Sequence, residues 1–147
     1  MRALDVAAGL ILAAALAAAP ARAAENTVQV DLQDASIDGS LQGMRMKLDR
    51  AAMKAGPVTF RVANRSKALI HEMVILRTNL TGSQLPYDSS KDIFVESRLE
   101  SLGEVPDLSP GKSGQLTLYL KPGPYLLTCN QPGHLHAGMW ARFTVMP

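Results

Sequence analysis

The sequence predicts an all-β protein, a sandwich or barrel of short strands. Seven segments either alternate apolar and polar residues or are largely apolar and partly β-branched, which is typical of strands. These segments are Thr27–Leu32, Met44–Leu48, Val58–Val62, His71–Leu76, Leu116–Leu120, Tyr125–Cys129 and Trp140–Val145. Turn-forming pairs separate several of them, among them Gly56-Pro57 and Pro110-Gly111. Strands at this spacing, with turn signals between them, favour an all-β fold.

One charged segment differs from the strands. Val95, Leu99 and Leu102 recur at helical spacing, and Asp88 or Ser89 is available as an N-cap. The sequence therefore predicts a short helical insertion around residues 88–102, placed between two strands.

The N-terminus has the features of a secretory signal peptide. Met1-Arg2 precedes the apolar run Val6–Ala19, and Ala21-Arg22-Ala23 fits the small-x-small cleavage rule. We predict a signal peptide over residues 1–23 and a single domain over 24–147. A membrane anchor is the alternative, but the run is shorter than the about 20 residues that a spanning helix needs. We expect a periplasmic protein that is not membrane-bound in its mature form.

The charge distribution excludes one class of function. The chain has 147 residues, with 15 Lys and Arg against 13 Asp and Glu, for a formal net charge of +2. The two signs are interleaved along the chain, whereas nucleic-acid-binding proteins concentrate basic residues on one face. We expect no nucleic-acid partner and a monomeric protein, steered to its partners only by local patches of charge.

The single cysteine, Cys129, opens the most informative segment. An unpaired thiol in an exported protein is open to oxidation unless burial or a metal protects it. A loop between two predicted strands joins Cys129 to His134 and Met139, and His71 begins an apolar strand far upstream. Two His, one Cys and a distant Met form the ligand set of trigonal electron-transfer copper sites. One copper ion, cycling between Cu(I) and Cu(II), is the expected cofactor.

The residues of this loop suit such a site. Strand alternation puts Tyr125, Leu127 and Cys129 on one face. Pro132-Gly133 allows the chain to fold back, so that His134 can approach the thiolate, and Gly138 allows a second turn before Met139.

Other assignments of these residues remain open. His136 is an alternative ligand to His134, although its position on the rim of the loop is favoured. Met44, Met46 and Met53 could form a methionine-rich Cu(I) site, but the alternation of Met44 and Met46 favours core packing. Glu72 is a further candidate ligand that alternation directs away from the face of His71.

The chain resembles the type 1 blue-copper cupredoxins of the plastocyanin and azurin kind. The resemblance rests on Gly56–Asn64, on His71-Glu72-Met73-Val74 and on the loop Cys129-x4-His134-x4-Met139, which is similar to the loops of auracyanin and rusticyanin. It implies a Greek-key β-sandwich with copper bound by His71, Cys129 and His134, and Met139 as a weak axial ligand. Glu72 departs from the family, whose members often carry Asn after the first His to tie the ligand loops together.

The leading functional hypothesis is a one-electron carrier that is not an enzyme by itself. We expect a redox donor and acceptor, or a copper-handling partner, to dock near His134 on a small apolar patch. The patch would comprise Pro132, Gly133, Leu135, Ala137 and Gly138. The alternative is a periplasmic copper-tolerance protein that buffers or delivers copper. A third hypothesis makes Cys129 a nucleophile with His134 as its base, but no orienting third group is evident.

Overall fold

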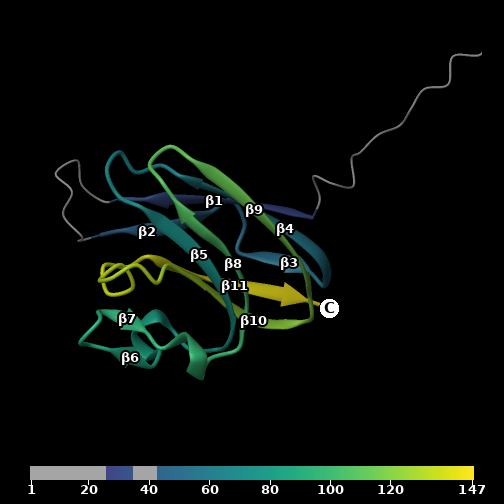
Figure 1. Ribbon diagram of the computed structural model, residues 1–147. Coiled ribbons are helices and arrows are strands. Elements are labelled where there is room, and N and C mark those ends of the chain that lie inside the picture. Colours follow the sequence, from purple (N-terminus) through teal and green to yellow (C-terminus); the bar gives the residue numbers. More distant parts are fainter. Residues whose placement is uncertain (1–25, 35–42) are drawn as a thin grey trace, which may run out of the picture.

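Two β-sheets pack face to face in the computed structural model, which describes residues 26–34 and 43–147 (Figure 1). The first sheet has the order β2-β1-β4-β9. Its strands are β1 (Thr27–Gln33), β2 (Arg45–Leu48), β4 (Gly56–Asn64) and β9 (Ser113–Leu120). The second has the order β3-β11-β10-β5-β8. Its strands are β3 (Ala52–Lys54), β5 (His71–Arg77), β8 (Ser101–Leu108), β10 (Gly123–Thr128) and β11 (Trp140–Met146). The predicted signal peptide, residues 1–23, lies outside the described residues.

Each predicted strand segment coincides with an observed strand, so the predicted all-β sandwich is confirmed. The pairs β1–β4 and β3–β11 are parallel, and the other pairs of these two sheets are antiparallel. The strands β3 and β8 were not predicted. Strand β3 has only three residues, and strand β8 carries Gly103 and Pro106, which obscure a period-two pattern.

The core lies between the two sheets and follows the alternation of the strands. Along β4, Val58, Phe60 and Val62 are buried while their neighbours face outward. Phe60 meets Phe143 of β11 edge to face, with ring centroids 5.4 Å apart. This T-shaped geometry is one of the two arrangements that aromatic pairs prefer. The buried residues between the sheets form the main apolar cluster. Met44, Met46 and Met53 belong to it, as predicted for core methionines.

The strand β5 is buried on both faces. Met73 and Ile75 point into the sandwich, whereas Val74 and Leu76 belong to a second apolar cluster on the outer face. The segment between β5 and β8 covers that outer face and contributes Leu85 and Phe94. This cover explains why the β5 sequence is almost continuously apolar rather than alternating.

The covering segment is the predicted insertion, but the predicted helix over 88–102 is wrong. The chain instead forms a small hairpin flanked by short 3-10 turns. The hairpin strands are β6 (Tyr87–Asp88) and β7 (Ile93–Phe94), and the turns are η1 (Gly82–Gln84) and η2 (Glu96–Arg98).

Local chemistry accounts for this difference. The Asp88 carboxylate accepts hydrogen bonds from the Ser90 backbone and hydroxyl, which favours a turn. Asp92 has φ of 60°, which ends any right-handed helix. Leu99 and Leu102 pack into different apolar clusters, although helical spacing would put them on one face.

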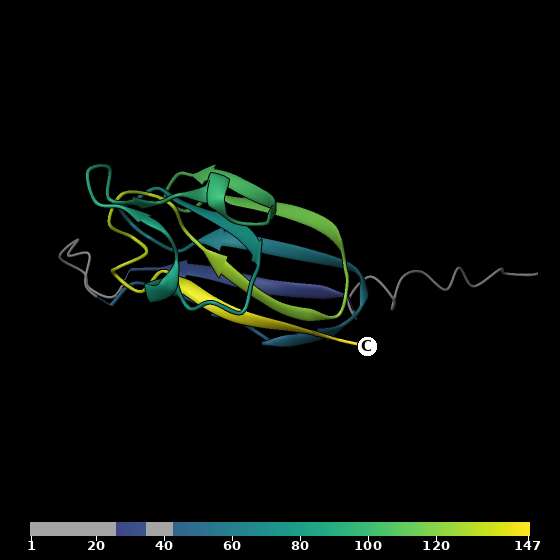
Figure 2. The same cartoon turned by 90° about the horizontal axis from the view of Figure 1, so that it is seen from below.

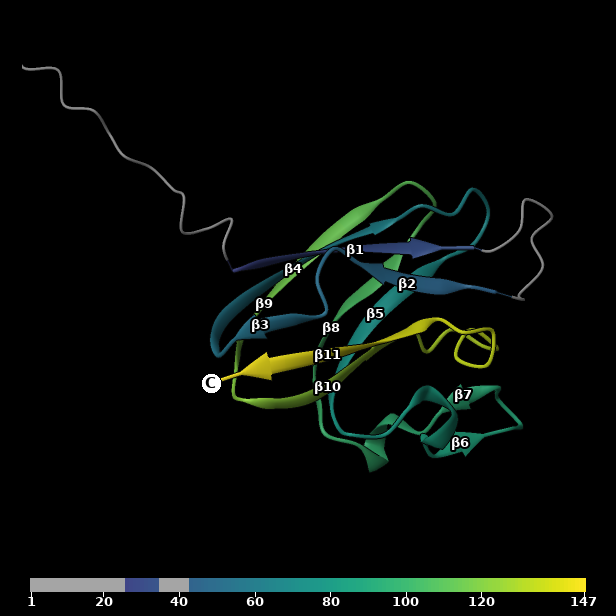
Figure 3. The ribbon, with the colours of Figure 1, turned by 180° about the vertical axis from the view of Figure 1, so that it is seen from behind.

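The hairpin β6–β7 lies beside the loop between β10 and β11, at the end of the sandwich opposite the C-terminus (Figures 1 and 3). The view from below shows the same arrangement (Figure 2). Among the residues that the structure describes, no helix has the length and apolarity needed to cross a bilayer.

Candidate metal centre

Two neighbouring strands bring His71 and Cys129 together. His71 is the first residue of β5, and Cys129 directly follows β10, which pairs with β5 in antiparallel register. His134 lies in the loop after Cys129. The candidate ligand atoms of these three residues all lie within 4.8 Å of one another. The predicted ligands from distant parts of the chain thus meet at one end of the sandwich.

Within the cluster, the two imidazoles approach each other through their Nδ1 atoms. His71 Nδ1 lies 3.1 Å from His134 Nδ1, and Cys129 Sγ lies 3.5 Å from the same His134 atom. His71 and Cys129 are fully buried, and His134 is 6% exposed. Two imidazole nitrogens this close need a proton or a cation between them, because two lone pairs would repel each other. This donor set therefore fits a soft or borderline metal ion.

Backbone hydrogen bonds close the ligand loop. The Cys129 N–H donates to the Met139 carbonyl (3.1 Å), and the Met139 N–H donates to the His134 carbonyl (3.0 Å). Gly133 and Gly138 have φ of 81° and 102°, so both predicted turns use conformations that favour glycine. Met139 is fully buried beside Cys129 in the main apolar cluster. The backbone hydrogen bonds of the loop therefore fix Cys129, His134 and Met139 relative to one another.

Burial favours the uncharged forms of Cys129 and His134. It raises the pKa of the Cys129 thiol to about 12. Burial first, and then the nearby His71, lower the pKa of His134 to about 4. At neutral pH the thiol is therefore protonated and His134 is a neutral imidazole. A bound metal ion would supply the positive charge that a thiolate requires here.

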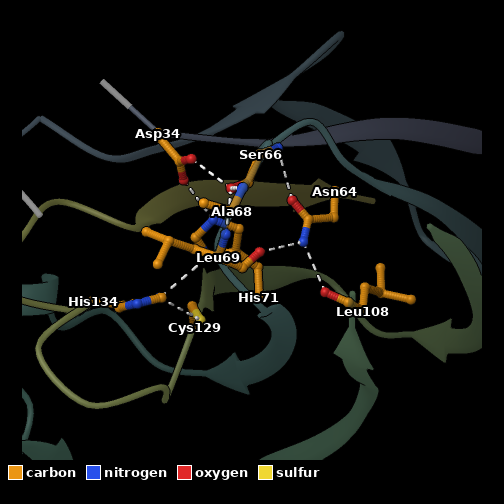
Figure 4. Close-up of polar contacts among 9 residues, drawn as sticks. All are labelled: Asp34, Asn64, Ser66, Ala68, Leu69, His71, Leu108, Cys129 and His134. Atoms are coloured by element: carbon orange, nitrogen blue, oxygen red, sulfur yellow. Dashed lines mark hydrogen bonds and ion pairs between the residues drawn. The ribbon is translucent and has the colours of Figure 1, made fainter. Parts of the chain in front are cut away.

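The chain that leads into His71 is held by the buried side chain of Asn64 and by Asp34. Asn64 Nδ2 donates to the carbonyl oxygens of Leu69 (2.8 Å) and Leu108 (2.7 Å), and Asn64 Oδ1 accepts from the Ser66 N–H. His71 Nε2 lies 2.8 Å from Asp34 Oδ1, on the side of the ring away from Cys129 (Figure 4). Asn64 thus ties the approach to β5 to the end of β8.

Glu72 ties the two ligand segments together. Its Oε1 accepts a hydrogen bond of 2.9 Å from the Asn130 backbone N–H, next to Cys129. Burial is the main cause that raises the pKa of Glu72 to about 7. The carboxylate therefore makes a link between ligand loops of the kind that the resemblance assigned to Asn. As alternation indicated, Glu72 is not part of the metal-binding group.

The hairpin β6–β7 braces the ligand loop. Asn130 Oδ1 accepts from the Phe94 N–H (2.8 Å), and Asn130 Nδ2 donates to the Phe94 carbonyl (3.2 Å). The Gly133 N–H donates to the Asp92 carbonyl (2.8 Å). Leu135 packs into the apolar cluster beneath the hairpin. The insertion therefore contacts the ligand loop on both sides of Gln131-Pro132.

The predicted apolar docking patch is partly wrong, because the hairpin buries two of its residues. Gly133 and Leu135 are buried, so they cannot contribute apolar surface to a partner. Pro132 is exposed, while Ala137 and Gly138 are partly exposed. The apolar surface near His134 is smaller than predicted because the insertion covers part of it.

The second histidine of the loop does not join the cluster. His136 is exposed, and its ring stacks against Tyr87 of β6 with centroids 4.1 Å apart. Tyr87 in turn donates a hydrogen bond to Asp92. The preference for His134 over His136 as a candidate ligand is thus supported by the geometry.

Truncating Asn130 should loosen the hairpin. Asn130→Ala leaves the Phe94 N–H and C=O groups without their side-chain partner, which we expect to cost about 1–3 kcal/mol of unfolding free energy. Amide hydrogen exchange at Phe94 and Gly133 should accelerate. Ser90→Ala, in the exposed turn of the same hairpin, is the control and should leave exchange at Gly133 unchanged. Equal exchange in both variants would contradict the brace.

No protein-family model and no curated protein matches the sequence. Solved structures do match. Dithionite-reduced auracyanin from Roseiflexus castenholzii is 22% identical, with a TM-score of 0.60 over 83% of this chain and 98% of that one. Auracyanin A of Chloroflexus aurantiacus, described as a blue copper protein, is 20% identical, with a TM-score of 0.53 over 82% and 98% of the two chains. Rusticyanin from Thiobacillus ferrooxidans is 19% identical, with a TM-score of 0.56 over 82% and 78%.

The chain has the cupredoxin fold. The resemblance drawn from the ligand loop is therefore confirmed at the level of architecture. In this cupredoxin fold, the sequence pattern predicts the members of the cluster but does not indicate that Asp34, Ser66 and Asn130 support it. Asp34 and Ser66 carry no motif, since their contact depends on how strands pair. Asn130 stands inside the ligand loop, but its partner Phe94 lies in a segment predicted to be helical.

Proposed function

We propose that this chain is an exported copper protein that carries single electrons. The observation that supports it is the convergence of His71 Nδ1, His134 Nδ1 and Cys129 Sγ in one buried cluster. These three atoms would hold the metal, with Met139 as a weak axial ligand. Bound copper would supply one-electron chemistry between Cu(I) and Cu(II).

The protein's own part in this function is to hold the ligands still and dry. The segments that carry His71 and Cys129 are fixed by hydrogen bonds that Asn64 donates and that Glu72 and Asn130 accept. A site that moves little on electron transfer loses little energy to reorganisation. We therefore favour electron carriage over copper delivery, because delivery requires the ligands to open and release the ion.

Electrons would enter and leave past His134. Its side chain is 6% exposed, whereas those of His71 and Cys129 are fully buried. The exposed residues Pro132 and His136 flank this edge and would contact a redox partner. A weak, brief encounter of this kind needs only a small interface. In this proposal the chain acts in the periplasm and catalyses no reaction by itself.

An optical titration with Cu(II) tests the proposal. The chain over residues 24–147 should bind one equivalent of copper and develop an intense thiolate-to-copper absorption band in the visible spectrum. Cyclic voltammetry should give a reversible one-electron wave. The absence of the band would end the copper proposal. Fast loss of Cu(I) to a chelator, together with an irreversible wave, would favour the copper-handling alternative instead.

A further inference from the structure

We propose that Asp34 is a positioning residue for His71, set in place by Ser66. It determines which imidazole nitrogen of His71 carries the proton, so that a lone pair faces the metal cluster, and its charge favours the oxidised ion. The inference rests on the proposed copper function for its second part alone, because the first part concerns the metal-free protein. Figure 4 shows the chain of contacts from Ser66 through Asp34 and His71 to His134.

The register of two parallel strands brings Asp34 and Ser66 together. Leu32 of β1 lies opposite Asn64 of β4. Asp34 and Ser66 each follow two residues later, where both strands have ended at the same end of the sheet. Ser66 Oγ donates to Asp34 Oδ2 at 2.5 Å. The other carboxylate oxygen, Oδ1, lies 2.8 Å from His71 Nε2.

Ser66 has only one way to bond to Asp34. Its oxygen already accepts hydrogen bonds from the backbone N–H groups of Ala68 (3.0 Å) and Leu69 (2.7 Å). A hydroxyl has one donor and two lone pairs. Both lone pairs are therefore occupied, and the hydroxyl must donate to whatever atom of residue 34 faces it.

The carboxylate of Asp34 then determines the tautomer of His71. An ionised carboxylate only accepts hydrogen bonds, so His71 Nε2 carries the proton. The lone pair of the ring is left on Nδ1, the atom that faces His134 and the metal cluster. A metal-ligating histidine whose other nitrogen donates to a carboxylate is held in orientation and is a more basic ligand.

The negative charge has a second consequence. The Asp34 side chain is 11% exposed and that of His71 is not exposed at all, so solvent screens their interaction weakly. A nearby negative charge stabilises the more positive state of a metal. Asp34 therefore lowers the reduction potential of the bound ion relative to a neutral residue at the same place.

Asp34→Asn alters both roles, because an amide is neutral and has one acceptor and one donor end. The Ser66 hydroxyl can only donate to residue 34, so the amide oxygen of Asn faces Ser66 and the amide NH₂ faces His71 Nε2. The proton of His71 therefore moves to Nδ1. In the metal-free protein, long-range ¹H–¹⁵N spectra should show the Nε2–H tautomer of His71 in wild type and the Nδ1–H tautomer in the variant. Copper affinity should fall by roughly 10–100-fold.

The double variant Asp34→Asn/Ser66→Ala provides the rescue. Without the Ser66 hydroxyl the amide can turn its oxygen to His71, so the Nε2–H tautomer and most of the affinity should return. The reduction potential should stay above that of wild type, because the charge is still missing. Ser66→Ala alone should keep the wild-type tautomer and controls for the lost bonds to Ala68 and Leu69.

Asp31→Asn, on the strand that leads to Asp34, is the matched control. Asp31 pairs with the exposed Arg65 and should change neither tautomer nor potential when neutralised. The same His71 tautomer in wild type and Asp34→Asn would overturn the proposal, as would no rise in potential. A wild-type protein without a thiolate-to-copper band would instead refute the copper function, while the tautomer result would still stand.

Discussion

Replacing Cys129 by Ser should abolish the visible thiolate-to-copper band completely. The side chain is fully buried within 3.5 Å of His134 Nδ1. A serine hydroxyl at that position is a hard, neutral donor that suits Cu(I) poorly. Copper affinity should fall by more than about 100-fold, since changes one shell further out already cost about 10–100-fold. Optical titration and competition with a chelator measure both effects.

His136→Ala is the control for this prediction. It removes a metal-binding side chain from the same loop, but His136 is exposed and stacks on Tyr87 outside the cluster. The band and the affinity should both survive. Retention of the band in Cys129→Ser, or its loss in His136→Ala, would mean that the ligand set is wrongly assigned. Amide spectra of the metal-free proteins establish whether each variant is folded.

Gly138→Ala should destabilise the protein by about 3 kcal/mol and weaken metal binding. Gly138 has φ of 102°, a backbone conformation that residues with a side chain rarely adopt. An added Cβ would lie 2.8 Å from the Met44 carbonyl oxygen. Relief of this clash must displace the turn that ends at Met139. Because the Met139 N–H donates to the His134 carbonyl, that shift reaches the cluster. Denaturant unfolding gives the stability change.

Gly111→Ala separates strain from close approach. Gly111 also has a positive φ, 74°, but an added Cβ would meet no atom within 4 Å. Its replacement should cost only about 1 kcal/mol, the penalty of the left-handed backbone, and copper affinity should not change. Equal losses in the two glycine variants would show that backbone strain alone, and not contact with Met44, makes Gly138 necessary.

The strands and the ligand loop could be predicted from the sequence because their signals are local. Alternation at Val58–Val62 or Tyr125–Cys129 states which side chains share a face, whatever the strand pairs with. Gly133 and Gly138 mark turns by the conformations that they alone adopt readily. Cys129 and His134 are five residues apart, so the loop itself brings them close.

The predicted helix failed for the opposite reason. Val95, Leu99 and Leu102 do recur at helical spacing. The side chain of Asn130, however, forms hydrogen bonds with the backbone N–H and C=O of Phe94, which are then not available to a helix. The Asp88 turn and the left-handed Asp92 then make a hairpin. Local periodicity carries no record of a competing partner elsewhere in the chain.

The sequence by itself determined the sandwich, the buried alternation and the Cys129–Met139 loop, since each depends on neighbouring residues. Only the tertiary structure decided that His71 Nδ1 stands 3.1 Å from His134 Nδ1, and that Asp34 and Ser66 support His71 from behind. These contacts join residues that lie 63, 37 and 32 positions apart. They depend on strand register, because the pairing of β1 with β4 and of β5 with β10 sets where the chain places these residues, and a one-residue slip would turn the side chain of His71 to the other face of its sheet.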